Sequence, residues 1–426
     1  MTDPISSSSS TSTNRLRAWR LAFSFFIYAQ AGMSDGSLGA QLVSIQSHYN
    51  LTFSVVSLIF LANAAGWLIG SFLNIYLLHH LDLWKILIVA SIFNITGSAI
   101  IIPSPPFPVF VVALFLLGIG ACIFDASFAA YTAHFDDGPA MSLLFAAFGF
   151  GALVAPLVVA GMLDNNIPWN TYYYVPLGIS IVNIPFLWMV FRSYHFPEEE
   201  GAAAGALQRF IRVIRSPAIL AGGVLVALSM ASGEILTSWL VSFMADIRHG
   251  NDASMRFVLS GYWVGLVLGR LTLAHATSRI GPRIAFAVYG ILATGLLAVI
   301  QFVDNVPINA VAAAFTGFFQ AQVFLLPSTP MIISLSSKWV PSSLVGPAVS
   351  VLTAFGLVGS AVGPLCIGFV NASGGLKYLP AITMGAIGTT LAVWYIAPSA
   401  PWRNRMVADS SETLDMKASE RSRVGP

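Results

Sequence analysis

Three carboxylic acids lie deep inside long apolar stretches of this 426-residue chain. Asp35 stands between glycines in QAGMSDGSLGAQL, and Asp125 and Glu234 have similarly apolar surroundings. An acid at the centre of a bilayer costs roughly 2.5–3.5 kcal/mol on insertion scales. We expect no lysine or arginine at the same depth, since Arg270 is expected near a helix end. Burial without a cation favours the neutral acid, so these side chains are suited to taking up and releasing protons.

Two of the acids have an alternative role. Asp35, with Gly32 and Gly36 beside it, would also suit a helix break, where its oxygens accept hydrogen bonds from freed backbone donors. Glu234 would also suit a hydrogen bond to a neighbouring helix.

The composition is that of a membrane protein. The chain is 56% hydrophobic and 9% charged, with a mean hydropathy of +0.79. A soluble domain carries about 25% charged residues. Several uncharged runs are long enough for one or two membrane-spanning helices, which need about 20 residues each. The sequence therefore predicts a multi-pass protein in a lipid bilayer, without a nucleic-acid partner.

Charges, prolines and glycine-rich turns predict an all-α membrane protein of twelve transmembrane helices in two pseudo-symmetric six-helix bundles. The helices are expected at 19–46, 54–79, 84–102, 107–134, 139–163, 173–194, 217–245, 253–276, 283–303, 307–335, 341–370 and 376–397. The expected domains are a disordered cytoplasmic tail (1–18), an N-terminal bundle (19–194), a cytoplasmic linker (195–216), a C-terminal bundle (217–397) and a cytoplasmic tail (398–426).

The two halves resemble each other at fixed spacing. Asp35 and Glu234 are 199 positions apart, as are Gly70 and Gly269, and AFGFGALVAP from 147 matches FGLVGSAVGP from 355. Shared spacing indicates a duplicated six-helix unit. Such repeats are typical of secondary transporters, whose binding site lies between the halves.

Positive charges predict the orientation. With the N-terminus in the cytoplasm, all but three of the 20 lysines and arginines fall on or near that side, the exceptions being Arg248, Arg256 and Lys377. Both termini are then cytoplasmic. The sequons at Asn50 and Asn371 fall in external loops and are candidate glycosylation sites.

The loop around Gly269-Arg270 … Arg279-Ile-Gly281-Pro282-Arg283 resembles the cytoplasmic glycine and basic signature of the major facilitator superfamily. The stretches GMSDGSLGAQLVSIQSHYNLTFSVVSLIF and GIGACIFDASFAAY are similar to fungal members related to the proton-coupled fucose permease. That resemblance implies proton coupling by an acid in the first helix, matched by Asp35, and by one in the fourth, matched approximately by Asp125. The fucose permease's asparagines near these acids are absent here, so a less polar solute becomes plausible.

Other polar and aromatic side chains within the expected spans are candidates for lining a solute cavity. The uncharged polar candidates are Gln30, Asn63, Gln320 and Gln322, with interhelical hydrogen bonds as their alternative role. The aromatic candidates are Tyr28, Tyr131, Trp239 and Trp263, with a lipid-facing, interfacial or core position as the alternative.

The sequence thus predicts a proton-coupled secondary transporter that moves a small organic solute by alternating access. It is expected to be a monomer of the plasma membrane that needs no cofactor or metal and is not an enzyme. A loose match of GFGALVAPLVVAG to a signature of drug exporters keeps proton-antiport efflux of a metabolite or toxin open. A non-transporting nutrient sensor is a further alternative.

Overall fold

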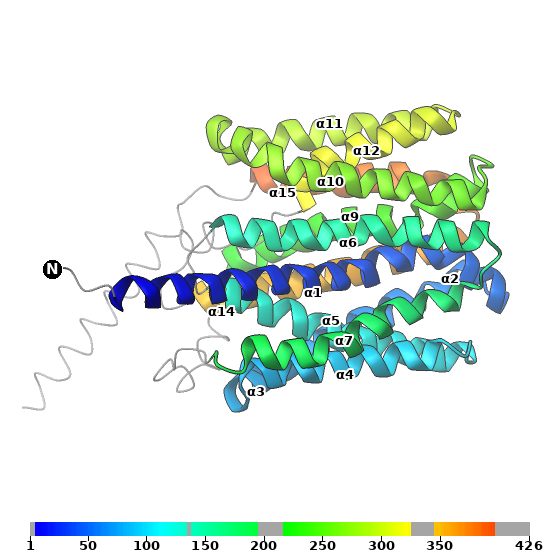
Figure 1. The fold of residues 1–426 in the computed structure, drawn as a ribbon. Coiled ribbons are helices and arrows are strands. Elements are labelled where there is room, and N and C mark those ends of the chain that lie inside the picture. The colour runs from blue at the N-terminus through cyan, green and yellow to red at the C-terminus, as the bar shows by residue number, and fades with distance from the viewer. Residues whose placement is uncertain (1–4, 134–137, 195–215, 325–344, 397–426) are drawn as a thin grey trace, which may run out of the picture.

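The computed structural model of the chain describes residues 5–133, 138–194, 216–324 and 345–396 (Figure 1). These residues form helices that run side by side along one common direction. The first half contains α1 (Ile5–Tyr49), α2 (Phe53–Val56), α3 (Leu58–His80), α4 (Leu83–Ile101), α5 (Phe107–Ala133), α6 (Gly138–Asp164) and α7 (Tyr174–Phe191). The second half contains α9 (Pro217–Asp246), α10 (Asp252–Ile280), α11 (Pro282–Phe302), α12 (Val306–Phe324), α14 (Val345–Ala372) and α15 (Leu379–Ile396). Short 3₁₀ turns, η1 (Trp169–Tyr173) and η3 (Gly375–Tyr378), precede α7 and α15.

Every range in which the sequence predicts a helix contains one. The N-terminal tail differs from its prediction, because α1 is already helical from Ile5 where disorder was expected for 1–18. Adding a turn to an existing helix is far easier than starting a new one, so a polar serine run can continue a long helix. The linker and C-terminal tail lie outside the described residues, so their boundaries remain predictions.

Nine of the described helices are long and apolar enough to cross a membrane. Three further helices, α1, α10 and α12, fall short of that standard. The apolar part of α12, Val306–Ala321, is too short, whereas α1 and α10 carry the charged residues Asp35 and Arg270 well inside their length. These two side chains need protein rather than lipid around them, so the helix faces that carry them belong to the interior of the bundle.

The sequence repeat corresponds to equivalent packing in space. Gly66 of α3 lies directly against the Phe115 carbonyl oxygen of α5, and Gly265 of α10 lies in the same way against Ala314 of α12. Both members of the first pair precede those of the second by 199 positions. A side chain at either glycine would collide with backbone, so close contact between these helices requires glycine. The two halves therefore repeat one packing arrangement.

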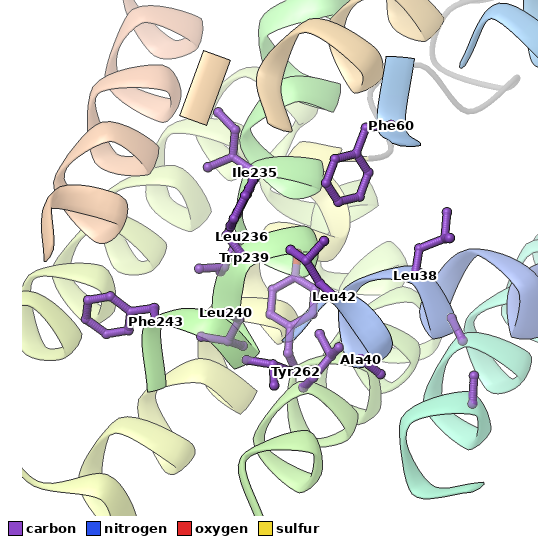
Figure 2. Packing of buried hydrophobic residues seen from close by; sticks show 14 of the residues in the cluster. Leu38, Ala40, Leu42, Phe60, Ile235, Leu236, Trp239, Leu240, Phe243 and Tyr262 are labelled. Carbon is purple, nitrogen blue, oxygen red and sulfur yellow. The ribbon is translucent and has the colours of Figure 1, made fainter. Parts of the chain in front are cut away.

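The largest apolar core crosses the boundary between the halves. Leu38 and Leu42 of α1 and Phe60 of α3 belong to the same buried cluster as Leu236 and Trp239 of α9 (Figure 2). Rings of Phe60 and Trp239 lie 6.2 Å apart between centroids. The two halves therefore share a continuous interior.

Contacts at the end of the bundle opposite the N-terminus join the halves tightly. Arg256 Nε of α10 donates to the Ala40 carbonyl of α1 over 2.8 Å. Gly368 of α14 lies so close to Ser57 that a Cβ atom would not fit between them. This end of the bundle is closed in the structure.

A second junction runs along α6 and α10. Ser260 Oγ of α10 donates to the Leu153 carbonyl of α6 over 3.1 Å. Ten residues further along α10, Arg270 Nη1 donates to the Phe145 carbonyl over 2.6 Å. The two helices thus remain bonded at two different depths.

Candidate functional site

Asp35 lies half-buried on α1, at the wall of a small cavity. Asn63 and Trp67 of α3, Tyr172 of η1 and Pro176 of α7 also line this cavity. Its volume is about 20 Å³, which is enough for a single water molecule. The structure thus places Asn63, a predicted cavity residue, beside the predicted proton-coupling acid.

Asp35 also lies near Glu234 of the other half. The backbones of α1 and α9 meet where Gly39 abuts the Thr237 carbonyl, and no Cβ atom would fit between them. Asp35 and Glu234 each lie about one turn before this crossing, and their carboxyl groups interact electrostatically. Two of the three predicted acids are therefore brought together across the boundary between the halves.

Glu234 has a local hydrogen-bond partner. The Thr237 hydroxyl lies 3.4 Å from Glu234 Oε2 and 3.2 Å from the Gly233 carbonyl oxygen. One hydroxyl shared between two acceptors at these distances forms only weak hydrogen bonds. The hydrogen bond from Thr237 therefore does not hold the Glu234 carboxyl firmly in place.

Asp125 forms a second cluster on α5. The Tyr28 hydroxyl of α1 donates a hydrogen bond to Asp125 Oδ1. The Tyr28 ring lies 5.9 Å from that of Phe145 and 5.7 Å from that of Phe148 on α6. Two helical turns separate Tyr28 from Asp35 on α1, which corresponds to about 10 Å along the helix. The structure therefore separates Asp125 from the Asp35–Glu234 pair.

Arg270 lies beside the Asp125 cluster, which corrects the sequence-based expectation. Since α10 continues to Ile280, Arg270 is an interior residue of the helix rather than one near its end, and it is 9% exposed. Its guanidinium lies 5.8 Å from the centre of the Phe145 ring, the same ring that lies 5.9 Å from that of Tyr28. The loop motif that follows Arg270 in the sequence had suggested a position at the membrane surface.

Tyr262 lies on α10, about two turns before Arg270. Its hydroxyl donates to Gln320 Oε1 over 3.0 Å, and Gln320 Nε2 donates to Ser232 Oγ over 3.1 Å. Gln320 is fully buried and joins α9, α10 and α12, so its alternative role in interhelical hydrogen bonding is the one observed.

The three acids have no basic partner in the part of the chain that the structure describes. The ion pairs found there join Lys85 to Asp82 and Arg248 to Asp304. The hydrogen-bond partners of Asp125 and Glu234 in that same part are instead the hydroxyl groups of Tyr28 and Thr237. These acids can gain and lose a proton without breaking an ion pair.

Gln30 is not among the residues that line the cavity at Asp35, although it bonds to Pro176, which lines it. Its Nε2 donates to Ser180 Oγ over 2.5 Å and to the Pro176 carbonyl over 3.2 Å, and Asn183 Nδ2 donates to its Oε1 over 3.0 Å. These bonds fasten α1 to α7, so the structure supports the alternative role of Gln30 in interhelical packing.

All four aromatic candidates are buried inside the protein. Tyr131 is fully buried, with its ring 5.4 Å from that of Phe191. Trp239 is also fully buried, and its Nε1 donates to the Pro364 carbonyl over 3.0 Å. These positions correspond to the core-packing alternative for both residues. The side chain of Gln322 lies outside those that the structure describes.

The two sequons differ in exposure. Asn50 is exposed at the end of α1, whereas the side chain of Asn371 is 3% exposed. A transferase needs access to the amide nitrogen, so the folded arrangement disfavours a glycan at Asn371. The sequence pattern could not show this, because burial here depends on packing of α14 against other helices.

The chain belongs to the Major Facilitator Superfamily, whose sequence model matches residues 24–249 and 222–414. It is 22% identical over 401 residues to Bypass of stop codon protein 6 of Saccharomyces cerevisiae, covering 86% of this chain and 80% of that protein. It is 24% identical over 413 residues to the glucose/mannose transporter GlcP of Bacillus subtilis, covering 93% and 98% respectively. Among solved structures, the Escherichia coli fucose:proton symporter FucP matches with a TM-score of 0.63 at 15% identity, covering 89% of this chain and 98% of that one. The family and the fold expected from the sequence are confirmed.

Proposed function

We propose that this transporter is coupled to protons and moves a small organic solute by alternating access, with Asp35 as the main coupling residue. The observation that carries the proposal is the Asp35–Glu234 pair at the crossing of α1 and α9. Each acid belongs to a different half, so a change in their charge acts directly on the junction that must open and close.

The physical effect follows from repulsion. When both acids are ionised, their like charges oppose close contact between α1 and α9, and the low dielectric strengthens this effect. Protonation of either acid removes the repulsion and favours the closed junction seen here. Protons thereby shift the balance between conformations, which is the requirement for coupling.

Asp125 is proposed as a second coupling group. Tyr28 donates its hydroxyl to this carboxyl and belongs to α1, the same helix that carries Asp35. A change in the charge of Asp125 would therefore alter a contact between α5 and α1. Motion of α1 then responds to both acids.

Two proteins similar to this chain are the glucose/mannose transporter GlcP and the fucose:proton symporter FucP. They support a proton-coupled carrier for a small organic molecule here. We propose that both termini lie in the cytoplasm and that the chain functions in the plasma membrane. Asn50 would then face the outside at the closed end.

The test is proton flux in proteoliposomes that contain a pH-sensitive dye. Fucose, glucose, mannose, small organic acids and apolar metabolites are added in turn, and the internal pH is recorded. Solute entry with acidification indicates symport, whereas entry with alkalinisation indicates the antiport used for export. An absence of flux for every solute would favour the sensor alternative.

Asp35→Asn is the informative variant. It is expected to bind solute and to exchange it across the membrane without a gradient, while losing accumulation driven by a pH difference. Asp304→Asn is the matched control, because that carboxyl is 79% exposed and pairs with Arg248 at 3.5 Å. Accumulation by Asp35→Asn at the level of the unmodified chain would contradict the coupling role.

A further inference from the structure

Arg270 is a cation buried in the interior of the bundle, with one hydrogen-bond partner within the described part of the chain. Its Nη1 donates to the Phe145 carbonyl, and its Nε has no hydrogen-bond partner among the described residues. No ion pair joins it to an acid in that same part of the chain. An isolated charge inside a protein costs several kcal/mol. The guanidinium of Arg270 bears this cost, because the described residues provide no anion that would stabilise it.

The surroundings of Arg270 favour an anionic ligand from outside the chain. Phe145 covers its guanidinium, and the ring of Tyr28 lies 5.9 Å from that of Phe145. The acid beside Tyr28, Asp125, accepts a hydrogen bond from the Tyr28 hydroxyl. A guanidinium presents several N–H groups in one plane and matches a carboxylate in a bidentate arrangement.

The position of Arg270 also fits a solute site. It lies where α6 of the first half meets α10 of the second, and transporters with repeated halves bind solute between them. Aromatic rings of Tyr28, Phe148 and Trp263 lie close to the same junction, with Phe148 and Trp263 centred 6.5 Å apart. A solute with one anionic group and an apolar body would match both the cation and these rings.

We propose that Arg270 binds the anionic group of the solute, and that the transported solute is a small organic acid. That a proton is transported together with this acid rests on the proposed function. With a neutral solute and protonated acids, the closing site would hold the unbalanced charge of Arg270. An organic anion that enters with a proton neutralises this charge, so the loaded site can be dehydrated at lower cost.

Equilibrium binding tests this without any transport step. The thermal unfolding midpoint of the purified full chain is measured at one fixed pH against matched acids and neutral analogues: benzoate with benzamide, lactate with lactamide, and glucuronate with glucose. At least one acid is expected to raise the midpoint in a saturable manner, and its neutral analogue is not. Equal effects within all three pairs would overturn the proposal.

Variants of Arg270 complete the test. Arg270→Gln is expected to raise the Kd for the effective acid about 30-fold or more, as for loss of a buried charge partner. Arg270→Lys keeps the charge but not the planar fork, and is expected to bind the acid about tenfold more weakly. Binding at the original affinity in Arg270→Lys and Arg270→Gln would overturn the proposal, and Arg270→Lys alone decides if the glutamine variant does not fold.

The matched control is Arg248→Gln. Arg248 also donates to backbone carbonyls, those of Ile300 and Gln301, but it pairs with Asp304 away from α6. Acid binding should be unchanged in this variant. The coupling role of Asp35 is tested by proton flux, and the role of Arg270 is tested by equilibrium binding. Failure of one prediction therefore does not contradict the other.

Discussion

Arg256 of α10 and Ala40 of α1 are joined by a hydrogen bond of 2.8 Å from the guanidinium Nε to the backbone carbonyl. Arg256 Nη2 also donates to Ser44 Oγ over 3.0 Å. The arginine is 1% exposed, so both bonds form away from water, where they are stronger. They hold the two halves together at the end opposite the N-terminus.

Arg256→Gln is expected to loosen that end. Hydrogen bonds from a charged donor contribute about 1.5–3 kcal/mol each, so labelling of a cysteine at this junction should accelerate about tenfold or more. The reporter is Ser57→Cys in a background with Cys122→Ser and Cys366→Ser, measured with a membrane-impermeant maleimide. The Arg248→Gln variant should leave the labelling rate unchanged. A rate unaffected by Arg256→Gln would mean that other contacts keep this end closed.

Tyr28→Phe should change the pH dependence of transport. The Tyr28 hydroxyl donates to Asp125, and a donor favours the ionised form of a carboxyl. Its removal makes proton release harder, so the midpoint of the pH profile should move upward by about one pH unit. The phenylalanine ring still fits beside Phe145 and Phe148, which preserves the packing. Solute uptake measured over a pH series gives the result, with Tyr49→Phe as the control because Tyr49 donates to the Pro105 carbonyl elsewhere. An unshifted pH profile would mean that Asp125 does not take part in proton coupling.

The repeated glycine contacts should be equally sensitive in the two halves. Gly66→Ala and Gly265→Ala each place a methyl group against backbone of the neighbouring helix. Overpacking of this kind destabilises by about 1–3 kcal/mol, which thermal unfolding in detergent can resolve. Gly295→Ala is the control, because a Cβ atom there meets nothing within 4 Å. Tolerance of alanine at both Gly66 and Gly265 would show that the contacts can relax.

Glycosylation should occur at Asn50 and not at Asn371. Asn50 is exposed, and Asn371 is 3% exposed. In a eukaryotic expression host, Asn50→Gln should abolish the mobility shift caused by glycosidase treatment, while Asn371→Gln should not alter it. If neither variant alters the shift, the glycan lies elsewhere. If no shift is present at all, Asn50 does not face the lumen during synthesis.

The helices and the repeat could be predicted well, because hydrophobic runs and the spacing of residues are visible in the sequence itself. Hydrophobic length locates each span, and the spacing of 199 positions between Asp35 and Glu234 relates the halves. The same spacing also links Gly66 with Gly265, whose equivalent contacts emerged only from the structure. Duplication is therefore readable from sequence, whereas the atoms each glycine meets are not.

The sequence was less informative about which polar residues meet. It gave Arg270 a position near a helix end, since the basic loop after it resembles a surface motif, but α10 continues to Ile280. It could not distinguish Gln30, which bonds to α7, from Asn63, which lines the cavity at Asp35. Both are uncharged polar residues in apolar spans, and only the rotation of each helix against its neighbours decides between them. The hydrogen bond between Tyr28 and Asp125 could not be predicted for the same reason.

The paired bonds between α6 and α10 have a mechanical consequence. Ser260 and Arg270 attach one helix to the other at points about 15 Å apart along the axis. A pair of helices bonded at two points can act as the axis about which the two bundles tilt. Because Arg270 belongs to this axis, the solute would lie where displacement is smallest, whereas the openings at the two membrane faces would move most.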